Sequence, residues 1–224
     1  MDRPELKLRP RADRRIRAGH VWVYSNEVDT EATPLKALPA GGEATLLTHD
    51  GKVLGTVVLS PNHLICARLI SRHGKQGLTR SLIKRRLEQA DARRQVLIGG
   101  EHYRMVYGDS DGLPGLVIDR FGADFVIQSS LAALEPWLEV IVHVLASKWS
   151  ARSVWLKNDG KMRAQEGLAE QVVCAHGPET SELSVTENGV TFGFDVVSGQ
   201  KTGWFFDHRN NRARLNALIA QLDA

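Results

Sequence analysis

Short apolar runs separated by turn residues make up the first 73 residues of the chain. A basic helical turn is expected over 11–19, and Asp50-Gly51 is expected to form a tight turn. Strands are predicted at 20–24, 43–48, 53–59 and 64–70. Strands this short, joined by glycine, proline and asparagine, are typical of a small β-barrel. A polar, glycine-containing linker is expected over 73–77.

A mixed pattern of helix and strand follows this linker. Helical spacing begins after an N-cap at Thr79, runs to about Ile98 and is stopped by Gly99-Gly100. The apolar side of this helix is expected to carry Leu82, Ile83, Leu87, Ala90 and Leu97. Further elements are predicted as strands at 103–107, 116–120, 125–129 and 153–157, a hairpin about Gly122 and a helix over 135–148. The order strand, hairpin, helix, strand predicts a compact α+β unit.

A hairpin and a helix are predicted for the last part of the chain. Strand-like residues at 185–187 and 190–196 flank an Asn188-Gly189 turn, which is a strong hairpin signal. Helical spacing continues over 207–222. Between them, 199–212 concentrates glycine, aromatic and charged residues. We expect this run to lead into a domain that the chain does not contain.

Composition indicates an ordinary globular protein. With 224 residues, 42% hydrophobic and 25% charged, the chain can form one or two globular domains. No run of 18 or more apolar residues and no apolar segment behind the N-terminus occurs, so neither a membrane span nor a secretion signal is predicted, and a cytoplasmic location is expected. Cys66 and Cys174 lie in or beside apolar runs, so we expect buried thiols and no disulfide, zinc site or catalytic thiol.

Charge is spread unevenly along the chain. Residues 1–20 carry seven Arg or Lys against three acids, and residues 68–95 carry nine against two, although the net charge of the whole chain is only +3. A polyanion would therefore meet a localised positive field. The alternative is that these are solvated helix faces balanced by acids in the fold. Arg86, Arg93 and Arg94 also interrupt the apolar side of the predicted helix, which argues against a single phosphate-binding stripe.

The loop 108–115 alternates carboxylates with glycines, as calcium loops do. The later ligands and the closing glutamate of a calcium loop are missing, so a structural turn is predicted and no metal site. The sequence has no Gly-x-Gly-x-x-Gly, no P-loop and no Gly-x-Ser-x-Gly. Because these motifs are missing, the sequence predicts neither a nucleotide site nor an acyl-transfer centre.

Three segments in this order carry a family resemblance: Gly-His-Val-Trp-Val-Tyr-Ser at 19–25, Gly-Asp-Ser-Asp-Gly-Leu-Pro-Gly at the start of 108–122, and Gln-Lys-Thr-Gly-Trp-Phe-Phe-Asp-His-Arg at the start of 200–212. With the Arg-rich start, the chain resembles the large-subunit rRNA (cytosine-5)-methyltransferases of the RlmI type, which use S-adenosyl-L-methionine (SAM). The resemblance covers essentially all 224 residues. It implies an α+β fold with three parts: a PUA-like β-barrel that binds RNA over 1–75, a central α+β domain over 78–180, and a β-hairpin and helix over 183–224 that lead into a Rossmann-like methyltransferase domain.

The chain departs from that family at the methyltransferase domain. The glycine-rich SAM loop, the acidic ribose-binding residue and the catalytic cysteine of the family have no counterpart in the sequence. Methylation of cytosine C5 requires a thiolate that adds at C6, and the contexts of Cys66 and Cys174 do not match this nucleophile. We therefore assign no catalytic residue, and we expect neither turnover nor SAM binding by this chain alone.

Two groups of candidate site residues follow from the charge pattern and the resemblance. The candidates for rRNA binding are Arg11, Arg14, Arg15, Arg17, His20 and Arg68, with Trp22 favoured as a core residue. The residues implied to border the SAM pocket are Lys201, Thr202, Gly203, Phe206, Asp207 and Arg209. The alternative for this second group is that the segment only packs the hairpin onto a neighbouring sheet. Ribosomal RNA is the expected partner, a membrane is not, and a homodimer is left open.

Three functional hypotheses remain at this stage. The chain is the substrate-binding part of an rRNA methyltransferase, a stand-alone PUA-type RNA-binding module without catalysis, or a protein-interaction domain with solubilising arginines. The last helix distinguishes the first two. Its residues Leu215, Leu218, Ile219 and Leu222 should form an open apolar face in the first case and be covered in the second. The third hypothesis predicts no steep salt dependence of RNA binding.

Overall fold

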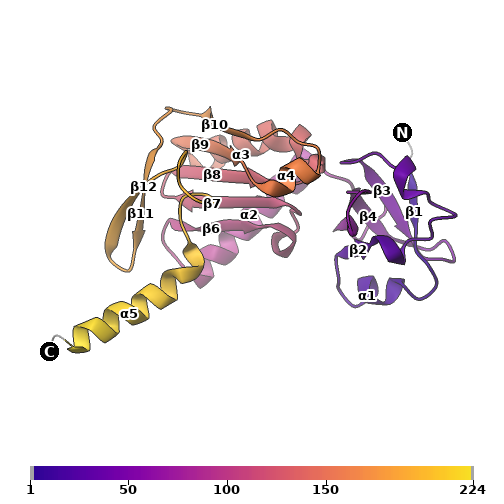
Figure 1. Ribbon diagram of the computed structural model, residues 1–224, viewed down its shortest axis with the longest axis horizontal. Coiled ribbons are helices and arrows are strands. Elements are labelled where there is room, and N and C mark those ends of the chain that lie inside the picture. The colour runs from indigo at the N-terminus through magenta and orange to yellow at the C-terminus, as the bar shows by residue number, and fades with distance from the viewer. Residues whose placement is uncertain (1–2, 223–224) are drawn as a thin grey trace.

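The computed structural model describes residues 3–222 and contains two five-stranded sheets with their helices, a two-stranded hairpin and a protruding helix (Figure 1). The first sheet forms from the N-terminal strands in the order β1-β3-β4-β5-β2. Its strands are β1 (Glu5–Lys7), β2 (Trp22–Tyr24), β3 (Glu43–Leu47), β4 (Val53–Leu59) and β5 (Ile65–Ser71). Strand β1 runs parallel to β3, and the other neighbours are antiparallel.

This first sheet curls on itself, as the prediction of a small barrel requires. The chain after β1 meets the chain after β2, where Leu8 bridges Val28 and the Arg9 amide donates to the Glu27 carbonyl at 2.9 Å. Alternate residues of the strands point inward, and Val23, Leu46 and others fill the interior. The short helix α1 (Asp13–Arg17) follows β1 and buries only Ile16, which confirms the predicted helical turn.

A long helix links the barrel to the second sheet. Helix α2 (Arg80–Leu97) starts at the predicted N-cap, because the Thr79 hydroxyl accepts a hydrogen bond from the Leu82 amide at 3.1 Å. The predicted apolar side is confirmed for its buried residues Leu82, Ile83, Leu87 and Ala90. It is wrong for Leu97, which is 78% exposed at the end of the helix.

The second sheet has the strand order β10-β9-β8-β7-β6. Its strands are β6 (His102–Tyr107), β7 (Leu116–Phe121), β8 (Asp124–Ser129), β9 (Ser153–Asn158) and β10 (Gln171–His176). The predicted hairpin is β7–β8, and helix α3 (Leu138–Trp149) crosses from β8 to its parallel neighbour β9. Helices α2 and α3 pack on one face of this sheet. The edge strand β10 and the short helix α4 (Lys161–Gln165) were not predicted.

The barrel and the second sheet share buried contacts. Val58 and Ile70 of the barrel belong to the same hydrophobic cluster as α2 and the second sheet. Arg86 of α2 donates hydrogen bonds to the carbonyl oxygens of Ile70 and Gly112, and so connects the barrel, the helix and the loop 108–115. This connection fixes the orientation of the barrel relative to the sheet.

A two-stranded hairpin covers the other face of the second sheet. Strands β11 (Glu182–Glu187) and β12 (Val190–Asp195) join through Asn188-Gly189, which both have the positive φ of a hairpin turn (52° and 79°). Leu183 and Val185 of β11 pack against Phe121, Val126 and Trp155 of the sheet. The predicted hairpin is therefore confirmed.

Helix α5 (Arg209–Leu222) extends away from the body of the molecule (Figure 1). It buries no residue. Its apolar side chains are exposed at Leu215 (56%), Leu218 (58%), Ile219 (47%) and Leu222 (85%). Of the two outcomes set out for this helix, the open apolar face is the one observed. Within residues 3–222, no helix combines the length and the apolar character needed to cross a bilayer.

Candidate functional site

The first candidate site is the outer face of β2. Val23 points into the barrel core, and its neighbours Trp22 and Tyr24 therefore lie on the outside. The Arg15 guanidinium lies 4.8 Å from the centre of the Tyr24 ring and donates to Glu27 at 3.0 Å. The core position favoured for Trp22 is wrong, because this residue is only half-buried and lies outside the core cluster.

Contacts connect Trp22 to the predicted RNA-binding residues. Its ring meets the His20 ring edge-on at 6.2 Å, and His20 Nδ1 lies 3.2 Å from the Arg15 guanidinium. Arg68 of β5 is the register partner of Trp22, so both side chains share the outer face. The fold thus brings residues that are almost 50 positions apart in sequence onto one surface. We call this group, together with the other arginines of the segment that carries Arg15, the basic barrel surface: Arg11, Arg14, Arg15, Arg17, His20, Trp22 and Arg68.

Only part of the charge on this surface is neutralised. Arg17 pairs with Asp13 at 2.6 Å, and Arg15 pairs with Glu27. Arg11 and Arg14 are exposed, and no carboxylate within residues 3–222 forms an ion pair with either. Exposed guanidinium groups beside half-buried aromatic rings can pair with phosphates and stack on unpaired bases.

Two arginines of α2 are paired with a buried carboxylate. Arg93 and Arg94 both pair with the buried Asp111, at 2.6 and 2.7 Å, and the Tyr107 amide donates to the same carboxylate at 2.6 Å. Burial opposes ionisation, but the bonds from Arg94, Tyr107 and Arg93 outweigh it and hold the pKa of Asp111 below its ordinary value. The loop 108–115 is therefore fixed by α2, as a structural turn would be.

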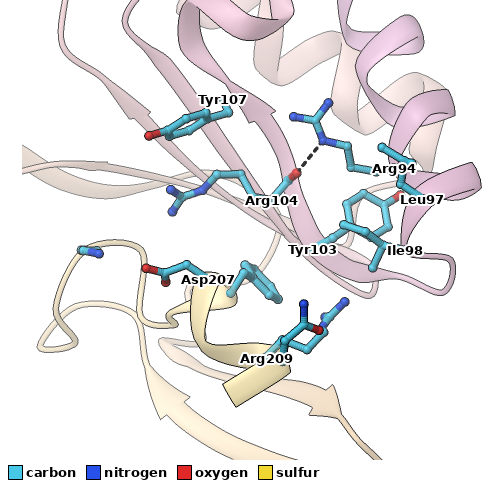
Figure 2. Close-up of a pocket in the computed structure, with 11 residues that line it drawn as sticks. Arg94, Leu97, Ile98, Tyr103, Arg104, Tyr107, Asp207 and Arg209 are labelled. Carbon is cyan, nitrogen blue, oxygen red and sulfur yellow. Dashed lines mark hydrogen bonds between the residues drawn. The ribbon is translucent and has the colours of Figure 1, made fainter. Parts of the chain in front are cut away.

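The second candidate site is a pocket of about 780 Å³ between α2, β6 and the segment 201–210 (Figure 2). Its volume lies in the range of pockets that take small molecules. One wall comes from the end of α2 and from β6, and consists of Arg94, Leu97, Ile98, Tyr103, Arg104 and Tyr107. The opposite wall consists of Lys201, Phe206, Asp207, Arg209 and Asn210. The lining therefore holds four cationic side chains and one carboxylate.

A buried carboxylate joins the two walls. Asp119 of β7 is fully buried and receives two hydrogen bonds from Arg104, both at 2.9 Å, and one from the Thr202 hydroxyl at 2.5 Å. Burial alone would lower the pKa of Arg104, but Asp119 outweighs this and raises it. Arg104 therefore stays charged and keeps one orientation toward the pocket.

Glu187 at the end of β11 holds the segment that forms the second wall. Its carboxylate is fully buried and accepts hydrogen bonds from Arg212, from the Trp204 indole at 3.2 Å and from Arg209 at 3.3 Å. Arg209 also donates to the His102 carbonyl of β6. These bonds fix the turn that carries Phe206 and Asp207 against the sheet.

Four of the six residues predicted to border a cofactor line this pocket. They are Lys201, Phe206, Asp207 and Arg209. Thr202 is buried beneath the lining, where it bonds Asp119. Gly203 lies against Phe194 with φ of +106°, so its contribution is to the turn.

Sequence reasoning missed the wall formed by β6. In a regular strand Arg104 and Tyr107 would point to opposite faces, but a register shift between Arg104 and Val106 brings them to the same side. The Arg104 guanidinium consequently lies 5.7 Å from the centre of the Tyr107 ring. No glycine or other residue pattern in β6 predicts this bulge.

Both cysteines have a thiol whose pKa is raised. Cys66 is buried in β5, and burial raises the pKa of its thiol to about 11. Cys174 lies on the edge strand β10 and is half-buried, not buried as predicted, and partial burial also raises its pKa. Across the part of the chain that the structure describes, no three metal-binding side chains come together.

Comparison with known proteins gives the following relatives. The model of a PUA-like domain matches residues 6–72. Proteins named Ribosomal RNA large subunit methyltransferase I match at 34% identity in Shewanella amazonensis (96% of this chain, 54% of the relative) and 32% in Shewanella denitrificans (93% and 53%). A third, from Aliivibrio fischeri, is 32% identical over 90% of this chain and 51% of its own length. The chain thus spans about half the length of these curated relatives.

Solved structures show the same fold. A SAM-dependent methyltransferase candidate from Streptococcus mutans superposes with a TM-score of 0.76 at 19% identity, over 95% of this chain and 54% of that chain. A second methyltransferase candidate, solved in complex with S-adenosylhomocysteine, gives a TM-score of 0.75 at 19% identity, over 95% of this chain and 52% of that chain. At this identity the likeness concerns the fold alone.

Proposed function

We propose that the chain is the RNA-binding and substrate-positioning part of an rRNA methyltransferase. It carries a PUA-like domain and is related along nearly its whole length to the proteins named Ribosomal RNA large subunit methyltransferase I. The enzyme would methylate large-subunit rRNA with SAM as donor and would act in the cytoplasm. The specific product, 5-methylcytosine, follows from the resemblance of the sequence motifs. Ribosomal RNA is then the partner of the basic barrel surface.

The observation that carries this proposal is the uncompensated charge of that surface. Arg11 and Arg14 are exposed and have no carboxylate partner in residues 3–222. They belong to the same short segment as Arg15, whose guanidinium lies 4.8 Å from the centre of the Tyr24 ring. Phosphate contacts supply most of the sequence-independent affinity for RNA, and aromatic rings supply stacking for unpaired bases. The barrel therefore has the groups that grip structured RNA.

The segment 201–209 is the proposed part of the cofactor site. SAM presents a carboxylate, an ammonium group, ribose hydroxyls and an adenine ring. The residues on this wall suit such a ligand, because Asp207 is an exposed hydrogen-bond acceptor and Phe206 offers an aromatic ring. When bound, SAM would supply the methyl group, and the role of this wall is to hold and orient it. Glu187 and Asp119 would keep the wall in place through the bonds described above.

The reaction also requires a thiolate, which we propose does not come from Cys66 or Cys174. Burial of Cys66 and the raised pKa of both thiols disfavour the reactive form. We therefore expect no methyl transfer by these 224 residues alone. The open apolar face of α5 favours a part that packs against further protein over a stand-alone module, because exposed apolar patches mark interaction sites. The homodimer stays a prediction.

RNA binding by the 224-residue chain tests the proposal. Affinity for a large-subunit rRNA transcript is measured by filter binding between about 50 and 200 mM salt, a range over which phosphate-dependent binding falls steeply. The double variant Arg11→Gln/Arg14→Gln should weaken binding and reduce the slope of log affinity against log salt by about one per lost phosphate contact. Lys52→Gln is the control, since Lys52 is exposed in the β3–β4 turn and already pairs with Asp50.

Two results would contradict the proposal. One is a wild-type chain that does not bind the transcript at the lowest salt concentration. The other is a double variant with the affinity and salt slope of Lys52→Gln, which would mean that the barrel arginines only solubilise the protein. Methyl transfer to rRNA by the 224-residue chain would overturn the assignment of the thiolate to another part of the enzyme.

A further inference from the structure

The two walls of the pocket differ in the chemistry that they offer. The wall from β6 and α2 holds two guanidinium groups and the exposed ring of Tyr107, and none of its lining residues is acidic. The wall from 201–210 holds the one lining carboxylate, Asp207. The buried carboxylates Asp111 and Asp119 lie behind the first wall and orient its arginines. The second wall also holds two cations, Lys201 and Arg209. An anionic ligand group therefore suits the first wall and the facing Lys201, and Asp207 is the one lining group that suits a cation.

Tyr107 is exposed but held in place. This large aromatic residue is 56% exposed and lies at the end of β6, an edge strand of the second sheet. Its backbone amide is anchored to the buried Asp111 at 2.6 Å, and within residues 3–222 its hydroxyl makes no hydrogen bond. An aromatic residue that is fixed at its backbone and more than half exposed can serve as a platform for stacking.

Arg104 is oriented beside this platform. Its Nε and Nη2 atoms are bonded to Asp119 at 2.9 Å each, and no acceptor among the described residues is bonded to Nη1. Figure 2 shows its guanidinium between the Tyr107 ring and the Asp207 carboxylate. Both of these groups help to raise the pKa of Arg104. Lys201, on the opposite wall, has no ion-pair partner in residues 3–222 and lies 4.2 Å from the centre of the Phe205 ring.

We propose that the β6 wall binds one unpaired nucleotide of the RNA substrate, whose base stacks on Tyr107 and whose phosphate contacts Arg104 and Lys201. This inference rests on the proposed function and extends it from the barrel to the pocket. A base that is to be methylated must leave its helical stack, and unpaired bases are held in proteins by aromatic and guanidinium planes. The nucleotide on one wall would then face the methyl donor on the other.

The test uses two RNA probes with the 224-residue chain. One is a fluorescently labelled, cytidine-rich single strand of about ten nucleotides, within the range of single-strand site sizes. The other is the same strand paired with its complement. By fluorescence anisotropy, Tyr107→Ala should weaken binding of the single strand about tenfold or more and leave duplex binding unchanged. Tyr107→Phe should bind like the wild type, because it keeps the stacking face.

The phosphate contact is tested by replacing Lys201. Arg104 is left unchanged, because its replacement would leave the buried Asp119 carboxylate without its cationic partner. Lys201→Gln should reduce the salt slope for the single strand by about 0.7, the value for one phosphate contact on a single strand. Lys161→Gln is the matched control, since Lys161 is an exposed lysine on α4 outside the pocket. Thermal unfolding of each variant must match the wild type. A 4-thiouridine in the single strand should crosslink to the peptide that contains Tyr107.

The outcomes separate this inference from the proposed function. If Tyr107→Ala binds the single strand as tightly as the wild type, the nucleotide site is overturned, whatever the barrel variants do. If Tyr107→Ala is defective but Arg11→Gln/Arg14→Gln is not, the pocket inference stands and the barrel assignment fails. S-adenosylhomocysteine is the third ligand to test. If it displaces the single strand, and if Tyr107→Ala weakens the binding of S-adenosylhomocysteine, the β6 wall binds the cofactor and the inference is wrong.

Discussion

Glu187 attaches the segment 204–212 to the β11–β12 hairpin, and replacing it tests how the pocket wall is held. The carboxylate is fully buried, and its two oxygens receive hydrogen bonds from Arg209, Arg212 and the Trp204 indole. Burial opposes its charge, but the bonds from Arg212 and Trp204 outweigh burial and lower the pKa of Glu187. Near neutral pH the group is therefore ionised. Glu187→Ala leaves all three donors without this acceptor.

The size of the effect follows from the exposure of the partners. Removing one partner of a buried ion pair costs about 3–5 kcal/mol when the other charge stays buried. Arg209 and Arg212 are 24% and 29% exposed, so water can replace part of the lost interaction. We expect a loss of about 2 kcal/mol in the free energy that keeps the segment closed, or about 30-fold more opening. Glu187→Gln keeps an acceptor and should lose about half as much.

Hydrogen exchange measured by mass spectrometry locates this loss. Amides in 204–212 should exchange about 30-fold faster in Glu187→Ala, while β7 and β8 exchange at the wild-type rate. Glu182→Ala is the control, because Glu182 lies on the same strand but is exposed. Unchanged exchange in 204–212 would refute the role given to Glu187. Faster exchange throughout the second sheet would show that its bonds stabilise the whole domain and not the wall alone.

Two further predictions concern stability. Gly203→Ala should lower the free energy of unfolding in urea by about 2 kcal/mol or more, because φ of Gly203 is +106° and an added Cβ would lie 2.3 Å from the Phe194 ring. Gly193→Ala is the control and should lower it by less than about 1 kcal/mol, because an added Cβ there meets open space. Asp111→Asn should destabilise the chain near pH 6 by about 2 kcal/mol. The pKa of Asp111 is lower in the folded chain than its ordinary value of 3.8. The stability that the Asp111 carboxylate contributes is therefore present above pH 3.8 and is lost as the pH falls further, so the unfolding curves of variant and wild type should converge toward pH 2. A difference that stays constant with pH would contradict the pairing of Asp111 with Arg94.

The elements that the sequence predicted are those with strong local signals. Thr79 and the Asn188-Gly189 turn define a helix start and a hairpin through their own backbone chemistry, and both occur as predicted. Strands β1 and β10 have no such signal. β1 is three residues long and pairs with residues 40 positions away, and β10 is an edge strand with exposed residues such as Val173. Their formation depends on partners that are distant in sequence.

The candidate site could be predicted only where its residues are contiguous. The run 199–212 supplied five pocket residues, of which four were predicted, because its glycines, aromatics and charges stand together in the sequence. Arg104 and Tyr107 reach the same pocket through a bulge, and Asp119 supports it from within an apolar strand. Trp22 was misassigned because alternation fixes which residues share a face but not which face is inward. Val23, and not Trp22, is the buried member of β2.

The two basic windows of the sequence differ once the chain is folded. In the window 68–95, Arg86 is bonded to backbone carbonyls, and Arg93 and Arg94 share the buried Asp111. Arg86 and Arg94 are largely buried, so their replacement should lower stability more than it lowers RNA affinity. In the window 1–20, Arg11 and Arg14 have no such partner among the described residues. Basic residues that look equivalent in the sequence therefore differ in the fold. The exposure of Arg11 and Arg14, which have no ion-pair partner among the described residues, supports the RNA-binding role that we propose for the barrel.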